Sequence, residues 1–100
     1  MKRLVVVLAL LFASDPAFAQ RQCRDGEKVT VTVKMNSAVQ HRDDLWRYVA
    51  LGGSPCTVGE ITGKGKTPES CVNGATMEAK GTIRPHPTFI ILDADEVRCF

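Results

Sequence analysis

The sequence predicts an all-β fold, a small barrel or sandwich built from about five short strands. Apolar and polar residues alternate strictly through residues 28–35 and 75–84, which is the pattern of strands with one buried face. Glycine, proline and asparagine separate these stretches from others that are rich in β-branched or aromatic residues. A closed barrel is favoured because it leaves no unpaired edge on a small sheet.

The first 19 residues are predicted to be a secretory signal peptide rather than part of the fold. Lys2 and Arg3 precede an unbroken apolar run at residues 4–12, and residues 17–19 (AFA) form a small-x-small cleavage signal. The run is about half of the roughly 20 residues that span a bilayer, so no membrane span is expected after cleavage. Residues 20–100 are then one small domain, located in a periplasm or outside the cell.

Four cysteines, all within residues 20–100, predict two disulfides. A domain this small buries only about 60% of its unfolded surface and usually needs covalent support. A four-cysteine zinc site normally has close cysteine pairs, whereas the nearest two here, Cys56 and Cys71, are 15 positions apart. Of the possible connectivities, we expect Cys23–Cys99, which joins the ends of the domain, with Cys56–Cys71, which closes a short loop.

The first predicted strand covers residues 28–35 (KVTVTVKM), whose valines and methionine share one face. The next segment fits two structures. Ser37 followed by Gln40 resembles a capping box and Gly52 a helix C-cap, so residues 37–51 could form a helix on an antiparallel sheet in an α+β fold. The aromatic and β-branched stretch 46–51 (WRYVAL) favours a turn followed by a strand, and this is the alternative that we prefer.

The second half adds three strands joined by loops. These strands are predicted at residues 56–63, 75–84 and 88–92, the last extending toward Cys99. The loop at residues 64–74 is expected to contain one helical turn from Pro68. The PHP sequence at residues 85–87 forces a turn.

A glycine- and lysine-rich stretch, residues 61–67 (ITGKGKT), raises the question of a phosphate-binding loop. The P-loop motif needs a glycine five positions before its Gly-Lys-Thr, and that position holds Glu60. No long helix is expected after the stretch. We therefore interpret it as a basic turn in which Lys64 and Lys66 are available to contact an anionic group.

The sequence contains no recognisable catalytic or metal-binding motif, so neither an enzyme activity nor a cofactor is expected. Neither His41 nor His86 has a nucleophile signature beside it, and His86 stands between two prolines as a turn residue. The acidic stretch at residues 92–96 (LDADE) falls short of the six to eight oxygen ligands that calcium takes. It is expected to be a solvated strand face.

Trp46 and Tyr48 are the candidate ligand-binding aromatic residues, because they share one strand face from which they could stack on a base or a sugar. Lys64 and Lys66 are the candidate cations. Two of the 13 basic and one of the 11 acidic residues lie in residues 1–19, which leaves 11 and 10, a net charge of +1. This balance does not indicate a nucleic-acid partner.

The C-terminal half resembles small exported bacterial proteins with an OB-fold. In that family a glycine precedes an alternating strand with a second glycine near its end, and a strand with a small or acidic end follows. The matching residues are Gly74, Gly81 and the stretch 92–99. The resemblance implies a five-stranded OB-like barrel, with a short helix at residues 68–72, and a ligand-binding face on the middle strands, where the four candidate residues belong.

The N-terminal stretch 23–33 (CRDGEKVTVTV) resembles the opening strand of secreted lysozyme-inhibitor domains. This resemblance implies a β-scaffold that offers a loop to a hydrolase, and the loop expected to be closed by Cys56–Cys71 suits that role because a cross-linked loop loses less entropy on binding. The sequence thus predicts a monomeric exported module, without catalytic activity, that binds an oligosaccharide, a polyanion or a partner protein. A hydrolase inhibitor is the alternative.

Overall fold

The computed structural model describes residues 21–100, and this part of the chain is all β, as predicted. The predicted signal peptide lies outside the described residues. Five strands are long, in agreement with the predicted number, and two are short. The strands are β1 (Arg21–Gln22), β2 (Lys28–Lys34), β3 (Gln40–Arg42), β4 (Leu45–Gly52), β5 (Cys56–Lys64), β6 (Thr76–Arg84) and β7 (Ile91–Cys99). Across residues 21–100 no helix is long and apolar enough to cross a membrane.

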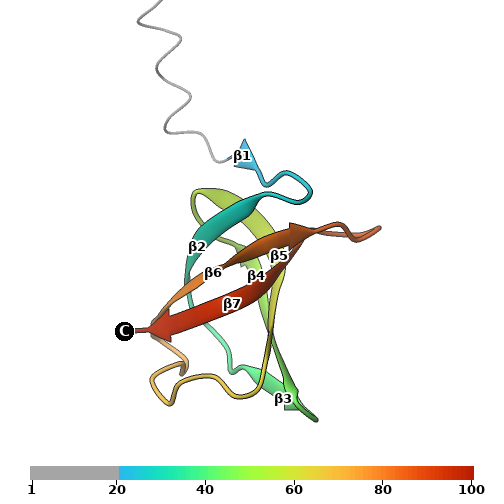
Figure 1. Ribbon diagram of the computed structural model, residues 1–100. Coiled ribbons are helices and arrows are strands. Elements are labelled where there is room, and N and C mark those ends of the chain that lie inside the picture. The colour runs from blue at the N-terminus through green and yellow to red at the C-terminus, as the bar shows by residue number, and fades with distance from the viewer. Residues whose placement is uncertain (1–20) are drawn as a thin grey trace, which may run out of the picture.

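The strands form one curled sheet in the order β2-β6-β7-β5-β4-β3 (Figure 1). Neighbours along it are antiparallel except β5 and β7, which run in parallel, and β1 adds a short parallel pairing to the start of β5. The sheet curls back on itself where Thr32 of β2 exchanges two backbone hydrogen bonds with Ser54, in the connection between β4 and β5, at 2.8 and 3.0 Å. The sheet is therefore a partly open barrel.

The alternating residues place one face of each long strand in a shared core. Val31 and Val33 of β2 lie opposite Ala79 and Met77 of β6, as their spacing predicts. The largest fully buried side chains are Tyr48, Met35, Ile61, Met77, Leu92, Val31, Val58 and Cys56.

Residues 37–51 form the β3–β4 hairpin and not a helix, which confirms the preferred alternative. Asp43 has a φ of 55° in the turn, and Arg47 donates to the side chain of Gln40 across the hairpin at 2.9 Å. Inward-facing Trp46 and Tyr48 are buried, whereas their neighbours Leu45, Arg47 and Val49 are exposed. This period of two matches a strand, and burial of the two aromatic rings outweighs the helix-capping signals.

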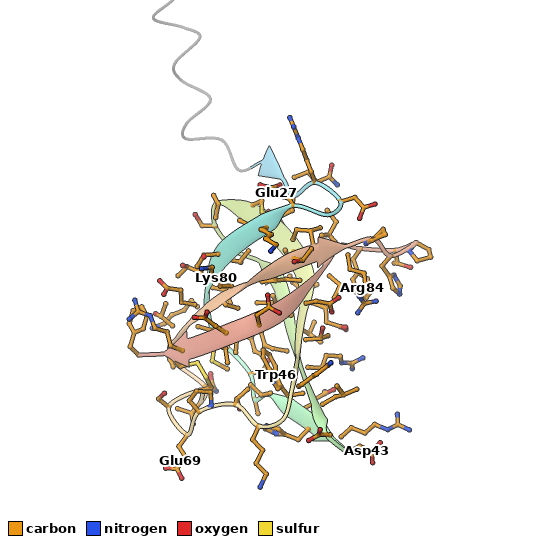
Figure 2. The ribbon with its side chains drawn as sticks, viewed as in Figure 1. Glu27, Asp43, Trp46, Glu69, Lys80 and Arg84 are labelled. Carbon is orange, nitrogen blue, oxygen red and sulfur yellow. A yellow bond between two sulfur atoms is a disulfide. The ribbon has the colours of Figure 1, made fainter. Side chains whose placement is uncertain are left out.

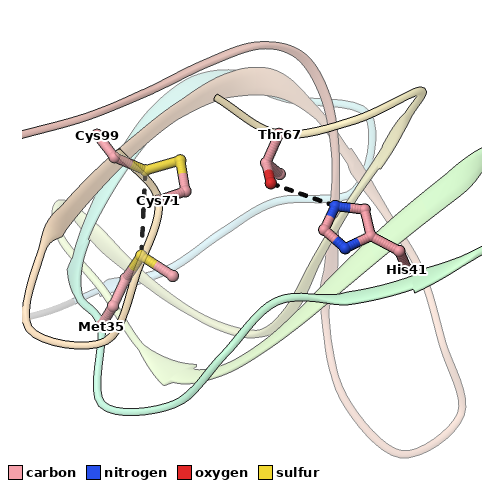
Figure 3. The surroundings of a disulfide bond; sticks show 5 residues. All are labelled: Met35, His41, Thr67, Cys71 and Cys99. Atoms are coloured by element: carbon pink, nitrogen blue, oxygen red, sulfur yellow. Dashed lines mark hydrogen bonds between the residues drawn. A yellow bond between two sulfur atoms is a disulfide. The ribbon is translucent and has the colours of Figure 1, made fainter. Parts of the chain in front are cut away.

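The two predicted disulfides form, but the predicted pairing is wrong. The bonds are Cys23–Cys56 and Cys71–Cys99, with Cα–Cα distances of 5.2 and 5.0 Å. Because β1 pairs with the beginning of β5, Cys23 lies beside Cys56. The loop after β5 returns to the end of β7, which brings Cys71 to Cys99 (Figure 3).

Two local predictions in the second half also need correction. Residues 68–72 form a turn instead of a helical segment, with a 3.0 Å hydrogen bond from Cys71 N to Pro68 O. The last strand begins at Ile91 rather than at residue 88. Phe89 instead stacks on His86 at 4.2 Å between ring centroids, and it packs over Gly59, where a Cβ atom would come within 2.7 Å of its side chain.

Candidate ligand-binding cleft

A cleft opens where β5 and β7 separate. The two strands pair only through residues 60–62 and 91–93. In β7, Ala94 pairs with Gly81 and Glu96 with Lys80, so Asp95 is an extra residue, a β-bulge, and bulges bend the strand that contains them. The space between β7, the β3–β4–β5 strands and the loop after β5 has a volume of about 1200 Å³. We call it the β5–β7 cleft.

The floor of the cleft is the inward-facing side of the sheet. It includes Trp46, Gly63, Ala94 and Val97. Trp46 lies directly across from Gly63 in the β4–β5 pairing, and a Cβ atom at residue 63 would overlap the indole ring. Glycine is therefore what allows the indole to lie flat against β5.

Trp46 is one of the residues that line the cleft. The residue is only 3% exposed, yet none of the hydrogen bonds found among residues 21–100 uses this N–H. Within the same residues, no fully buried side-chain nitrogen or oxygen lacks a partner. The N–H therefore retains slight solvent access, and the cleft is an opening that this residue lines. Figure 2 shows Trp46 between β7 and the β4–β5 strands.

Tyr48 shares the inner face with Trp46, as the sequence indicates, but it does not line the cleft. It is fully buried. Its hydroxyl accepts a 2.9 Å hydrogen bond from Asn36 N and donates to Asn36 Oδ1 at 3.3 Å. Since Trp46 is also nearly covered, neither ring offers a free face on which a base or a sugar could stack.

Lys64 and Lys66, the two predicted cations, both line the cleft. The loop that carries them is attached to the β3–β4 turn. Gly65, with a φ of 77°, donates its N–H to Asp44 O at 2.6 Å, and a hydrogen bond joins Thr67 Oγ1 to His41 Nε2 at 3.3 Å (Figure 3). The glycine-lysine stretch is thus an anchored rim of the cleft, and a glycine conformation makes its turn.

The rim carries both signs of charge. Its other side is β7, where the exposed Asp95 and Glu96 face the opening. Altogether five cations and four carboxylates line the cleft, namely Arg42, Arg47, Lys64, Lys66 and Arg84 with Asp43, Asp93, Asp95 and Glu96. The site is close to neutral but strongly polar. Most of these charges were not predicted, because only the strand pairing brings them together.

A hydrogen-bonded ion pair lies at the closed end of the cleft. Arg84 Nε and Nη2 donate to Asp93 at 2.7 and 3.2 Å, and Thr62 Oγ1 donates to the same carboxylate at 2.8 Å. The hydrogen bond from Arg84 lowers the pKa of Asp93 below its ordinary value, against partial desolvation, and the bond from Thr62 acts in the same direction. Asp93 is thus more than a solvated strand residue, and it ties β5, β6 and β7 together.

This ion pair gives the stability a weak acid dependence. Because the folded pKa of Asp93 is lowered, its contribution is fully present above the ordinary carboxyl pKa and is lost as pH falls through the folded value. Both side chains are about half exposed, so we expect roughly 0.2–1 kcal/mol. Urea unfolding of the wild type and Asp93→Asn should differ by this amount near pH 6 and converge near pH 2.

The control for this titration is Asp95→Asn, because Asp95 is exposed and makes no ion pair within residues 21–100. Its unfolding free energy should stay within about 0.5 kcal/mol of wild type at both pH values. A difference between wild type and Asp93→Asn that persists unchanged in acid would contradict the assigned role of the carboxylate.

The other candidate chemistry is dispersed. His41 lies in β3 and His86 in the loop before β7, where its Nδ1 accepts a hydrogen bond from Thr88 N at 3.1 Å. Among the described residues, no three histidine, cysteine or acidic side chains are grouped as metal ligands. Comparison of the chain with protein-family models, curated proteins and solved structures finds no match.

Proposed function

We propose that the protein is an exported, non-enzymatic binding module whose β5–β7 cleft takes an extended segment of a partner protein. The observation that carries this proposal is the composition of the cleft, an apolar floor beneath a rim of mixed charge. A volume of about 1200 Å³ exceeds the range of about 300–1,000 Å³ for small-molecule pockets. A polymer segment suits it better.

The charges and rings argue for a polypeptide over the other ligands considered. A polyanion would meet the carboxylates of β7 as well as the cations, and nucleic-acid sites combine a basic groove with exposed aromatic faces. The covered rings of Trp46 and Tyr48 give neither a base nor a sugar a stacking surface. Polypeptides, by contrast, carry both charges and apolar groups along one chain.

The sheet architecture supports an OB-like module. Five long strands form a partly open barrel, and the cleft lies over β4 and β5, the second and third of them. OB-folds bind ligands on the corresponding face, although fold analogy alone does not assign a function. Two disulfides suit an oxidising compartment such as a periplasm or the cell exterior.

The hydrolase-inhibitor alternative loses its candidate contact loop. That loop was expected to be closed by Cys56–Cys71, and those cysteines bond to other partners. We therefore propose the cleft, and not a cross-linked loop, as the binding surface.

The test is differential capture with two matched charge reversals. Lys64→Glu/Lys66→Glu changes the rim, whereas Lys28→Glu/Lys34→Glu changes exposed residues of β2 outside the cleft by the same charge. We expect a protein from periplasmic or extracellular extract that wild type and the β2 variant retain equally, and that the rim variant retains at least about tenfold less. Equal capture by all three proteins would overturn the proposal.

A further inference from the structure

The β5–β7 cleft exposes a long strand edge. From Ala94 to Cys99, β7 has β6 on one side and no strand on the other among residues 21–100. On the opposite wall, residues 63 and 64 of β5 have β4 as their only neighbouring strand within the described part of the chain. Unpaired N–H and C=O groups along such an edge are a template for another strand, and several peptide-binding domains use an open edge in this way.

The side chains that line the cleft suit the alternating side chains of a bound strand. Ala94 and Val97 face inward, since they pair with Gly81 and Ala79 of β6, and Trp46 completes this floor. Lys64 and Glu96 face outward on opposite walls. Successive residues of an inserted strand would therefore meet an apolar floor and a charged rim in turn.

The edge is protected against a second copy of itself. Asp95 forms a bulge and Glu96 places a carboxylate beside it, and both bulges and charges are devices that prevent edge-to-edge pairing. Two copies of β7 would bring like charges together, which destabilises cross-strand pairs. A partner strand with a basic side chain opposite Glu96 would instead gain a favourable pair.

We propose that the cleft binds its partner by strand addition, with a peptide of about five residues pairing along the β7 edge. The edge from Ala94 to Arg98 spans about 17 Å at about 3.4 Å per residue, and beyond it Cys99 is bonded to Cys71 of the loop after β5. The peptide alternates small apolar residues, which face Ala94 and Val97, with residues of both charges, which meet Lys64 and Glu96. This inference rests on the proposed function and specifies how the same site works.

The experiment is selection of a displayed heptapeptide library on the purified disulfide-bonded protein. We expect enriched peptides to alternate apolar and charged residues. In amide-exchange NMR, a synthetic selected peptide should slow exchange at least about tenfold at those amides within Ala94–Val97 that point away from β6, because these amides gain partners. Methylating alternate backbone nitrogens of the peptide should weaken binding at least about tenfold, because it removes the donors of the added ladder.

The charge on the edge is tested separately. Glu96→Lys should shift selection from basic toward acidic side chains at one peptide position, whereas Glu69→Lys, the same change at an exposed residue outside the cleft, should leave selection unaltered. Selected peptides that need Lys64 and Lys66 but tolerate N-methylation would overturn strand addition while leaving the cleft as the binding site. Enrichment of no peptide, or only of peptides insensitive to Lys64 and Lys66, would overturn both proposals.

Discussion

Replacing Gly63 by alanine is expected to lower the free energy of unfolding by about 1–3 kcal/mol, the usual cost of overpacking a well-filled core. The new Cβ would overlap the Trp46 indole, so the ring must leave its place on β5. Because Trp46 is the only tryptophan, its fluorescence emission should shift to longer wavelength as the ring becomes more exposed. Urea unfolding and the emission spectrum measure the two effects on one sample.

Gly52→Ala is the matched control for this change. Gly52 ends β4, and a Cβ atom there would have only one neighbour within 4 Å, the carbonyl oxygen of Ala50 at 3.9 Å. The same substitution should therefore be neutral or stabilise by up to about 1 kcal/mol through the unfolded state. If Gly63→Ala matched this control in stability and emission, the close packing of the indole on β5 would be refuted.

Peptide binding should fall only in Gly63→Ala, since the displaced ring would enter the cleft.

Removing either disulfide is expected to cost nearly the same stability but to affect binding differently. The bonds enclose similar lengths of chain, with separations of 33 and 28 residues. The chain-entropy estimate is about 3.6 kcal/mol for each, which corresponds to a fall in Tm of roughly 15–25 °C. Cys71→Ala/Cys99→Ala and Cys23→Ala/Cys56→Ala should therefore unfold at similar temperatures, which a calorimetric scan measures.

Binding separates the two variants because only Cys71–Cys99 joins the loop after β5, which lines the cleft with Lys66 and Pro68, to β7 on its other side. This bond fastens the loop after β5 to the end of β7 (Figure 3), and so it sets how far the two walls can separate. At a temperature where both variants are folded, Cys71→Ala/Cys99→Ala should bind partner or peptide at least about tenfold more weakly, since a more mobile site must be ordered on binding. An equal loss in both variants would show that the disulfides support the fold alone.

The long strands could be predicted because their pattern is local. Alternation in residues 28–35 and 75–84 requires a buried face whatever the partner strand is, and β2 and β6 form there. The start of β7 was misplaced because Phe89, which lies before the strand, is apolar for another reason. Phe89 covers Gly59 and stacks on His86, contacts that no sequence period reveals.

The disulfide pairing and most of the cleft depend on tertiary structure. The parallel pairing of β1 with β5 brings Cys23 close to Cys56. The sequence around either cysteine contains no pattern that predicts this pairing. Lys64 and Lys66 were found because a basic glycine loop is visible in sequence, whereas Glu96 becomes part of the site only through the divergence of β7 from β5. Tyr48 shares the spacing of Trp46, but its depth in the core is a property of the folded sheet.

The observed disulfide pairing also divides the covalent structure into two parts. The predicted pairing, in which one closed loop lies inside the other, would not. Cys23–Cys56 and Cys71–Cys99 follow one another along the chain, so the covalent structure is two separate rings joined by the single stretch of residues 57–70. Both cysteines of each ring lie in the same half of the chain, so each disulfide can form without the other half. A single cut in residues 57–70 would leave two rings with no covalent bond between them, held together only by the sheet.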